Sequence, residues 1–102
     1  MHLVQLLLPL YDNSRNPFAR AVFAEVHAEL VERFGGLTAY TRAPAQGVWK
    51  DEADTSRRDD IIIYEVMTGD LDRAWWKQYR KRLEKQFAQA ELVIRHQEVE
   101  LL

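Results

Sequence analysis

The segment that most constrains the fold is residues 61–67, which read IIIYEVM. Its length and its content of β-branched residues predict a strand, and Gly69 marks its end. Side chains alternate between the two faces of a strand, so Ile62 and Val66 share one face while Ile61, Ile63 and Met67 share the other. The strand is apolar on both faces, and each face therefore needs a cover.

The rest of the chain supplies elements that can provide one of these covers. Apolar side chains recur at three and four spacing in residues 18–34 and 71–87, as amphipathic helices require. Asn16 with Pro17, and Asp70, are the expected helix starts, and Gly35 with Gly36 ends the first helix. The expected order begins with a strand from residue 2 that stops at Pro9, a helix and a strand at 37–42. An irregular connection over 43–60, with a short extended piece at 47–49, then leads to the strand at 61–67, a helix, and a strand at 91–101.

This order predicts an α+β, ferredoxin-like βαββαβ fold, with a four-stranded antiparallel sheet and two helices on one face. The first strand is also two-faced, with Val4, Leu6 and Leu8 on one side and Leu3 and Leu7 on the other. The helices cover only one face. We therefore expect a second copy of the chain to cover the other, in a two-fold homodimer.

The element order and the two-faced strands resemble the dimeric α+β barrel superfamily. Residues 34–49, with Gly36, Leu37, Thr38 and the run Gly47-Val48-Trp49, are similar to a segment of its uncharacterised bacterial members. The resemblance implies a homodimer whose two sheets enclose a partly lined cavity, often the ligand site. The superfamily includes small monooxygenases and muconolactone isomerase-like enzymes, so an enzyme of this kind would be a monooxygenase or an isomerase that needs no cofactor.

Composition excludes several other classes. The 102 residues fit one domain over 1–102, and 14 basic against 16 acidic residues leave a net charge of −2, unlike a dedicated nucleic-acid binder. The absence of cysteine excludes disulfides and thiolate metal sites, which fits the cytoplasm, and no apolar run is long enough to be a membrane span. The basic residues near position 80 are expected to form a solvated helix face, because the 61–67 strand lacks the glycine and aromatic pattern of RNA-recognition modules.

Glu65 is the most informative single residue, because a carboxylate in an otherwise apolar strand must be partnered or reach solvent. Because side chains alternate along a strand, its odd-numbered position places it on the same face as Ile61, Ile63 and Met67. One interpretation is a catalytic group that points into the cavity and transfers protons. The alternative is a structural ion pair with Arg42 or Arg95 of neighbouring strands.

Other polar strand residues are expected near Glu65 and could hold a small polar ligand. Adjacent residues point to opposite faces, so at most one of Arg95 and His96 can join them. Trp49 either closes the mouth of a pocket or anchors its loop. The predicted ligand-binding residues are Gln5, Tyr40, Arg42, Trp49 and His96, and neither a metal nor a cofactor is expected.

Two functions remain open at this point. One is a homodimer that binds, and through Glu65 transforms, a small and partly apolar molecule in a cavity between sheet and helices. The other is a structural or interaction module without catalytic activity, in which dimer packing by residues such as Leu3, Leu7, Ile63 and Met67 fills the sheet face.

Overall fold

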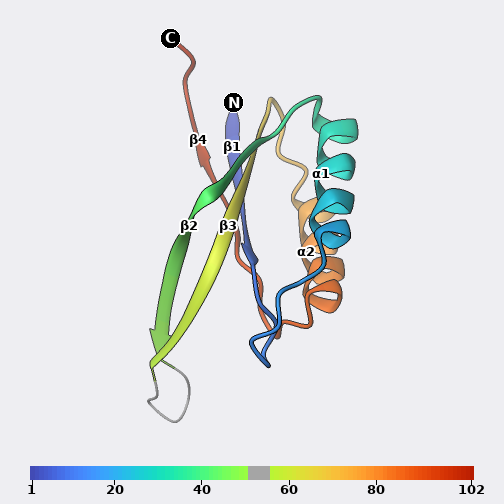
Figure 1. The fold of residues 1–102 in the computed structure, drawn as a ribbon. Coiled ribbons are helices and arrows are strands. Elements are labelled where there is room, and N and C mark those ends of the chain that lie inside the picture. The colour runs from blue at the N-terminus through green and yellow to red at the C-terminus, as the bar shows by residue number, and fades with distance from the viewer. Residues whose placement is uncertain (51–55) are drawn as a thin grey trace.

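The computed structural model describes the backbone of residues 1–50 and 56–102 and the side chains of residues 1–41 and 60–102. The elements follow the order β1 (His2–Pro9), α1 (Arg20–Phe34), β2 (Thr38–Lys50), β3 (Ser56–Thr68), α2 (Arg73–Gln86) and β4 (Ile94–Glu98). The strands form one antiparallel sheet in the order β2, β3, β1, β4. Both helices lie on the same side of it (Figure 1). The predicted α+β, ferredoxin-like arrangement is confirmed.

Strand parity decides which side chains meet the helices. In β1, Val4, Leu6 and Leu8 are at most 1% exposed, whereas Leu3 and Leu7 are only half-buried. The same alternation runs through residues 61–67 of β3, where Ile62, Tyr64 and Val66 are buried and Met67 is exposed. The core between sheet and helices comprises Val4, Leu6, Leu8, Val26, Leu30, Ile62, Tyr64, Val66, Trp76, Tyr79, Leu83, Phe87 and Leu92.

The start of α1 differs from the expected one at Asn16 and Pro17. The Asp12 carboxylate accepts the backbone N–H groups of Ser14 and Asn16, at 2.8 and 2.9 Å, and so closes a tight turn before the helix. The Phe18 N–H then donates to the Leu10 carbonyl. These contacts hold the residues before the helix in a turn, closed by an antiparallel bridge between Tyr11 and Pro17, and the helix begins only at Arg20.

The end of α1 is as expected. Gly35 has a φ of 80°, in the left-handed region that favours glycine, and its N–H donates to the Val31 carbonyl at 2.8 Å.

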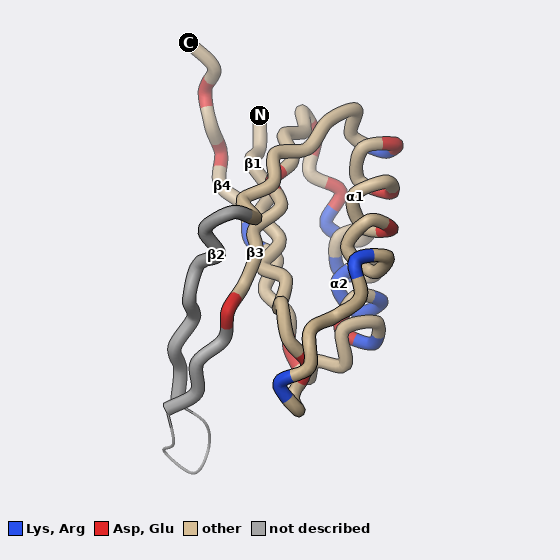
Figure 2. Tube along the Cα trace, viewed as in Figure 1, with Lys and Arg blue, Asp and Glu red and all other residues tan. Residues whose placement is uncertain are grey.

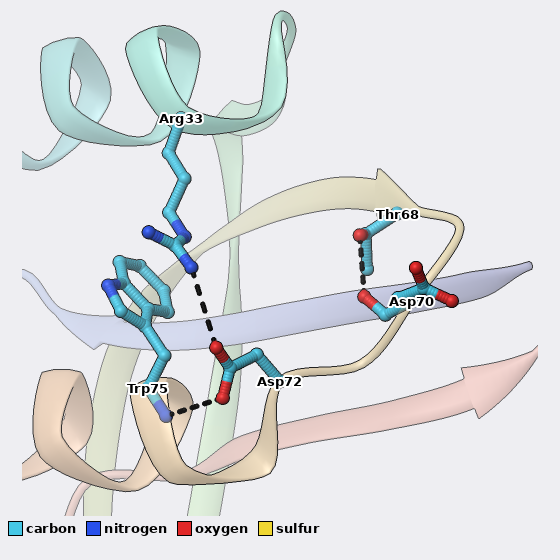
Figure 3. Close-up of polar contacts among 5 residues, drawn as sticks. All are labelled: Arg33, Thr68, Asp70, Asp72 and Trp75. Carbon is cyan, nitrogen blue, oxygen red and sulfur yellow. Dashed lines mark hydrogen bonds and ion pairs between the residues drawn. The ribbon is translucent and has the colours of Figure 1, made fainter.

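The N-terminus of α2 lies two residues beyond the predicted cap at Asp70. Asp72 is the residue whose side chain accepts the N–H of Trp75, at 3.1 Å (Figure 3). The other carboxylate oxygen of Asp72 lies 3.7 Å from the Arg33 guanidinium, which links the start of α2 to the end of α1. The Asp70 carbonyl instead accepts the Thr68 hydroxyl, at 2.7 Å, in the turn that leaves β3.

The expected irregular connection over 43–60 is wrong for most of its length. After a register irregularity between Tyr40 and Ala45, β2 pairs again with β3, from Ala45 opposite Ile61 to Lys50 opposite Ser56. Two paired strands satisfy each other's backbone groups whatever their side chains are. This hairpin extension therefore needs no apolar alternation, and sequence periodicity could not reveal it.

The final strand is shorter than the predicted 91–101. β4 pairs with β1 only from Ile94 opposite Leu6 to Glu98 opposite His2. Before it, the Leu92 N–H donates to the Glu84 carboxylate at 2.9 Å, and the Leu92 side chain enters the core. The approach to β4 is thus fixed by α2 together with β1, whose Leu7 N–H donates to the Val93 carbonyl at 3.0 Å.

The helices also contact each other through charged and aromatic groups. Acidic residues lie along α1 and basic ones along α2 (Figure 2), and Arg82 pairs with Glu29. The Arg82 guanidinium also lies over the ring of Tyr79, 4.8 Å from its centroid. Burial, reinforced by the nearby Glu29 charge, raises the pKa of Tyr79. Of the adjacent tryptophans, Trp76 is buried in the core, while Trp75 is partly buried and stacks on Tyr79 with centroids 4.7 Å apart.

Truncating Leu83 tests the core. Leu83 is fully buried between α2 and the sheet, so Leu83→Ala should lower the free energy of unfolding by about 2–5 kcal/mol. Leu101→Ala makes the same chemical change at a residue that is 62% exposed, and should change it by less than about 0.5 kcal/mol. Urea denaturation followed by circular dichroism measures both, and equal losses would contradict this assignment of the core.

Candidate functional site

The face of the sheet that the helices leave uncovered carries the candidate site. We call this face the open face (Figure 1). Five apolar side chains of this face are half-buried or exposed: Leu3, Leu7, Ile61, Ile63 and Met67. Glu65 lies among them, as its parity predicted. It therefore points away from the layer between sheet and helices, which the core side chains fill.

The strand register brings polar residues of all four strands into one row across the open face. Gln5 lies opposite Glu65 of β3 on one side and opposite Arg95 of β4 on the other. Thr38 of β2 lies opposite Glu65, and Tyr40 lies one position further along the same face. The row lies between Leu3 and Met67 at one end and Leu7 and Ile63 at the other.

Hydrogen bonds connect this row, which we call the polar row: Tyr40, Glu65, Gln5 and Arg95. Gln5 donates from Nε2 to Glu65 Oε1 at 2.6 Å, and the Tyr40 hydroxyl donates to Glu65 Oε2 at 3.3 Å. Arg95 donates from Nε to Gln5 Oε1 at 2.8 Å. The Gln5 amide therefore lies between a cation and an anion, which fixes its orientation, since its oxygen must face the guanidinium.

The polar row presents a carboxylate in which each oxygen already accepts one hydrogen bond. An ionised carboxylate has about four acceptor positions, so Glu65 retains capacity for a donor on a ligand. Arg95 is exposed and keeps further N–H donors. The open face thus offers an acceptor at its centre, a cation near the β4 edge, and apolar surface on both sides.

Of the six predicted site residues, three lie together, two have side chains outside the described ones, and His96 lies elsewhere. Gln5, Tyr40 and Glu65 lie together in the polar row. The side chains of Arg42 and Trp49 lie outside the described ones. Arg95, expected either as an ion-pair partner of Glu65 or as an alternative to His96 near it, does join the row, but it reaches the carboxylate through Gln5.

His96 does not lie near Glu65. In the register of β4 it pairs with Val4, whose side chain enters the core, so His96 projects toward the helix side of the sheet. Its ring lies 5.4 Å from the ring of His2, which shares that face. The sequence predicted that at most one of the adjacent residues Arg95 and His96 would lie near Glu65, and Arg95 is the one that lies on the open face. The sequence contains no signal for this choice, which depends on the register between two strands far apart in the chain.

Two further observations bear on what the chain can do. Within the part of the chain that the structure describes, no three His, Asp or Glu residues are placed to hold a metal ion together. Among the described residues, no helix combines the length and the apolar character needed to cross a bilayer.

Comparison with known proteins adds information on the fold. No protein-family model and no curated protein matches the sequence. Among solved structures, a phage SAM lyase in complex with S-methyl-5'-thioadenosine is similar, with a TM-score of 0.62 and 12% sequence identity. The match covers 95% of this chain and 80% of the lyase chain. At this identity the likeness establishes a shared fold.

A double-mutant cycle tests the polar row. Gln5→Ala and Glu65→Ala should couple by about 1 kcal/mol in the free energy of unfolding, because the bond between them is short, charged and half-buried. Tyr40→Phe with Glu65→Ala should couple less, because the Tyr40 hydroxyl is exposed and 3.3 Å away. Urea denaturation of the variants measures both cycles. Additive effects of Gln5→Ala and Glu65→Ala would contradict the bond.

Proposed function

We propose that this protein is a small-molecule-binding homodimer whose subunits face each other across their open faces, with the polar row at the ligand site. The observation that carries the proposal is the hydrogen-bonded row of Tyr40, Glu65, Gln5 and Arg95, set among apolar side chains on an uncovered sheet. A buried site of this composition would select a partly apolar ligand with a polar or cationic group for Glu65.

The exposure of the open face supports the homodimer. Met67 is 50% exposed and Tyr40 is 51% exposed, beside three half-buried residues, Leu7, Ile61 and Ile63. Soluble monomers rarely expose large contiguous groups of apolar side chains. A second copy is the natural cover because a two-fold axis brings the same surface to both sides. The polar row of each subunit would then lie at the interface.

The polar row favours proton transfer as the reaction, if catalysis accompanies binding. Glu65 would act as the base, since its carboxylate retains acceptor positions beyond those that take the bonds from Gln5 and Tyr40. The proton would pass from the ligand to the carboxylate without a cofactor. The similarity to a lyase structure that holds S-methyl-5'-thioadenosine supports a small-molecule ligand on this fold and supplies a compound to test.

The apolar side chains also favour a second function, that of an interaction module. Leu3, Leu7, Ile63 and Met67 could pack directly against their copies and leave no space at the interface. This function shares the homodimer with the first and differs in having no ligand at Glu65, so ligand binding separates the two.

Placing a charge on the open face tests the homodimer. Ile63→Glu puts a carboxylate at the centre of the proposed interface and should convert the dimer to a monomer in size-exclusion chromatography with light scattering. Val31→Glu introduces the same charge on α1, away from the sheet, and should leave the dimer intact. A monomeric unmodified protein, or a dimer that survives Ile63→Glu, would overturn the proposed assembly.

Ligand binding tests the role of Glu65. S-methyl-5'-thioadenosine at ten times its dissociation constant should raise the Tm of the protein by several degrees, because it binds only the folded state. Glu65→Gln should abolish this shift and keep the dimer, whereas Glu32→Gln, an exposed carboxylate on α1, should not change it. A dimer with no shift would favour the interaction module, and an equal shift in Glu65→Gln would exclude the polar row as the site.

A further inference from the structure

A separate cavity lies on the helix side of the sheet, between α2 and the edge strand β4. Its volume is about 160 Å³. Its apolar surface comes from Val4, Leu71, Ile94 and the indole of Trp76. The remaining lining residues are His96 and four cations: Arg73, Lys77, Arg80 and Arg95. None of the lining residues is acidic. The cavity therefore combines an apolar surface with a strongly basic rim.

The fold itself gathers these cations. Arg73, Lys77 and Arg80 follow one another at spacings of four and three residues, which places them along one side of α2. Arg95 comes from β4, which lies beside this part of the helix. Four like charges around a small cavity repel one another, a cost that a bound anion would offset.

Among the ion pairs of the described residues, one involves a cation of this rim. Glu84 lies 3.9 Å from Arg80, measured from its Oε2 to the arginine Nε, and that carboxylate oxygen also accepts the Leu92 N–H. Within residues 1–41 and 60–102, Arg73 and Lys77 form no ion pair with a carboxylate. Two cations of the rim are thus available to a ligand.

Trp76 supplies an independent indication of a ligand. The residue is only 7% exposed, and its Nε1 is buried with no hydrogen-bond partner among the described residues. A buried indole N–H without an acceptor is costly, and tryptophans in protein interiors usually have one. An oxygen of a molecule bound in the cavity that Trp76 lines would be such an acceptor.

We propose that this cavity binds a small organic phosphate. A phosphate carries up to two negative charges and several acceptor oxygens, which match guanidinium groups and the ammonium of Lys77 better than a single carboxylate does. The apolar surface takes the organic group. The volume is below the roughly 300–1,000 Å³ of drug-sized sites, so the ligand is compact and not a nucleotide. The basic residues of α2 thus have two different roles. Arg82 pairs with Glu29 of α1, whereas Lys77 and Arg80 line the cavity.

The site is distinct from the polar row, because it lies on the opposite side of the sheet and uses different side chains, except for Arg95 at the edge. Glu65→Gln should therefore leave phosphate binding unchanged. Arg95 is kept intact in the test, so that failure of this proposal and failure of the proposed function remain distinguishable.

Phenyl phosphate is the probe for the test. Added to the ¹⁵N-labelled protein, phenyl phosphate should shift the indole N–H resonance of Trp76 and the backbone resonances of Arg73 and Lys77. The Trp76→Phe variant assigns the indole resonance by its loss. Lys77→Gln and Arg73→Gln should each weaken binding about tenfold, the usual loss for one charge-assisted hydrogen bond. Lys81→Gln removes the same charge from an exposed position of α2 that does not line the cavity, and should weaken it less than twofold.

Several results would overturn the proposal. If Lys81→Gln weakened binding as much as Lys77→Gln, the helix would attract anions by its general charge alone. If inorganic phosphate bound as tightly as phenyl phosphate, the apolar surface would play no part and an organic phosphate would be the wrong ligand. Shifts that leave the Trp76 indole unmoved would place the phosphate elsewhere. Circular dichroism of the two glutamine variants shows that they remain folded, so a loss of binding reports on the site.

Discussion

One constraint organises this structure: a single β-layer has two faces, and two helices can cover only one of them. Alternate side chains of β1 and β3 enter the core with α1 and α2: Val4, Leu6, Leu8, Ile62, Tyr64 and Val66. The described side chains of the open face are also largely apolar, yet no described element of this chain lies over them. Burial of apolar surface is the dominant favourable term in folding and association alike. The open face is consequently where association with a partner or a ligand would gain the most.

The sequence was sufficient to predict the architecture but not the residues at which individual helices and strands begin and end. Alternation in residues 61–67 and the helical periodicities predicted the element types, their order and the face on which Glu65 lies. The start of α1 depended on the Asp12 turn, and the extension of β2 and β3 depended on backbone pairing. Neither leaves an apolar pattern in the sequence. Local hydrogen bonds of this kind shift an element's end by several residues without altering the fold.

The sequence predicted on which strand face each candidate site residue lies, but not which residues are hydrogen-bonded to one another. Parity placed Gln5 and Glu65 on definite faces of their own strands, but only the register showed that Gln5 lies between Glu65 and Arg95. The same register turned His96 to the other side of the sheet. Cross-strand partners depend on how strands remote in the chain align, and a single sequence contains little information about that alignment.

The short edge strand β4 has a role out of proportion to its five residues. Its consecutive residues Arg95 and His96 project to opposite sides of the sheet: Arg95 joins the polar row and reaches the rim of the basic cavity at the edge, while His96 belongs to the cavity alone. Sliding β4 by a single position would exchange them, and would dismantle both arrangements at once. The Glu84 carboxylate accepts the Leu92 N–H just before this strand, and this bond therefore helps to fix the register of β4 on which both surfaces depend.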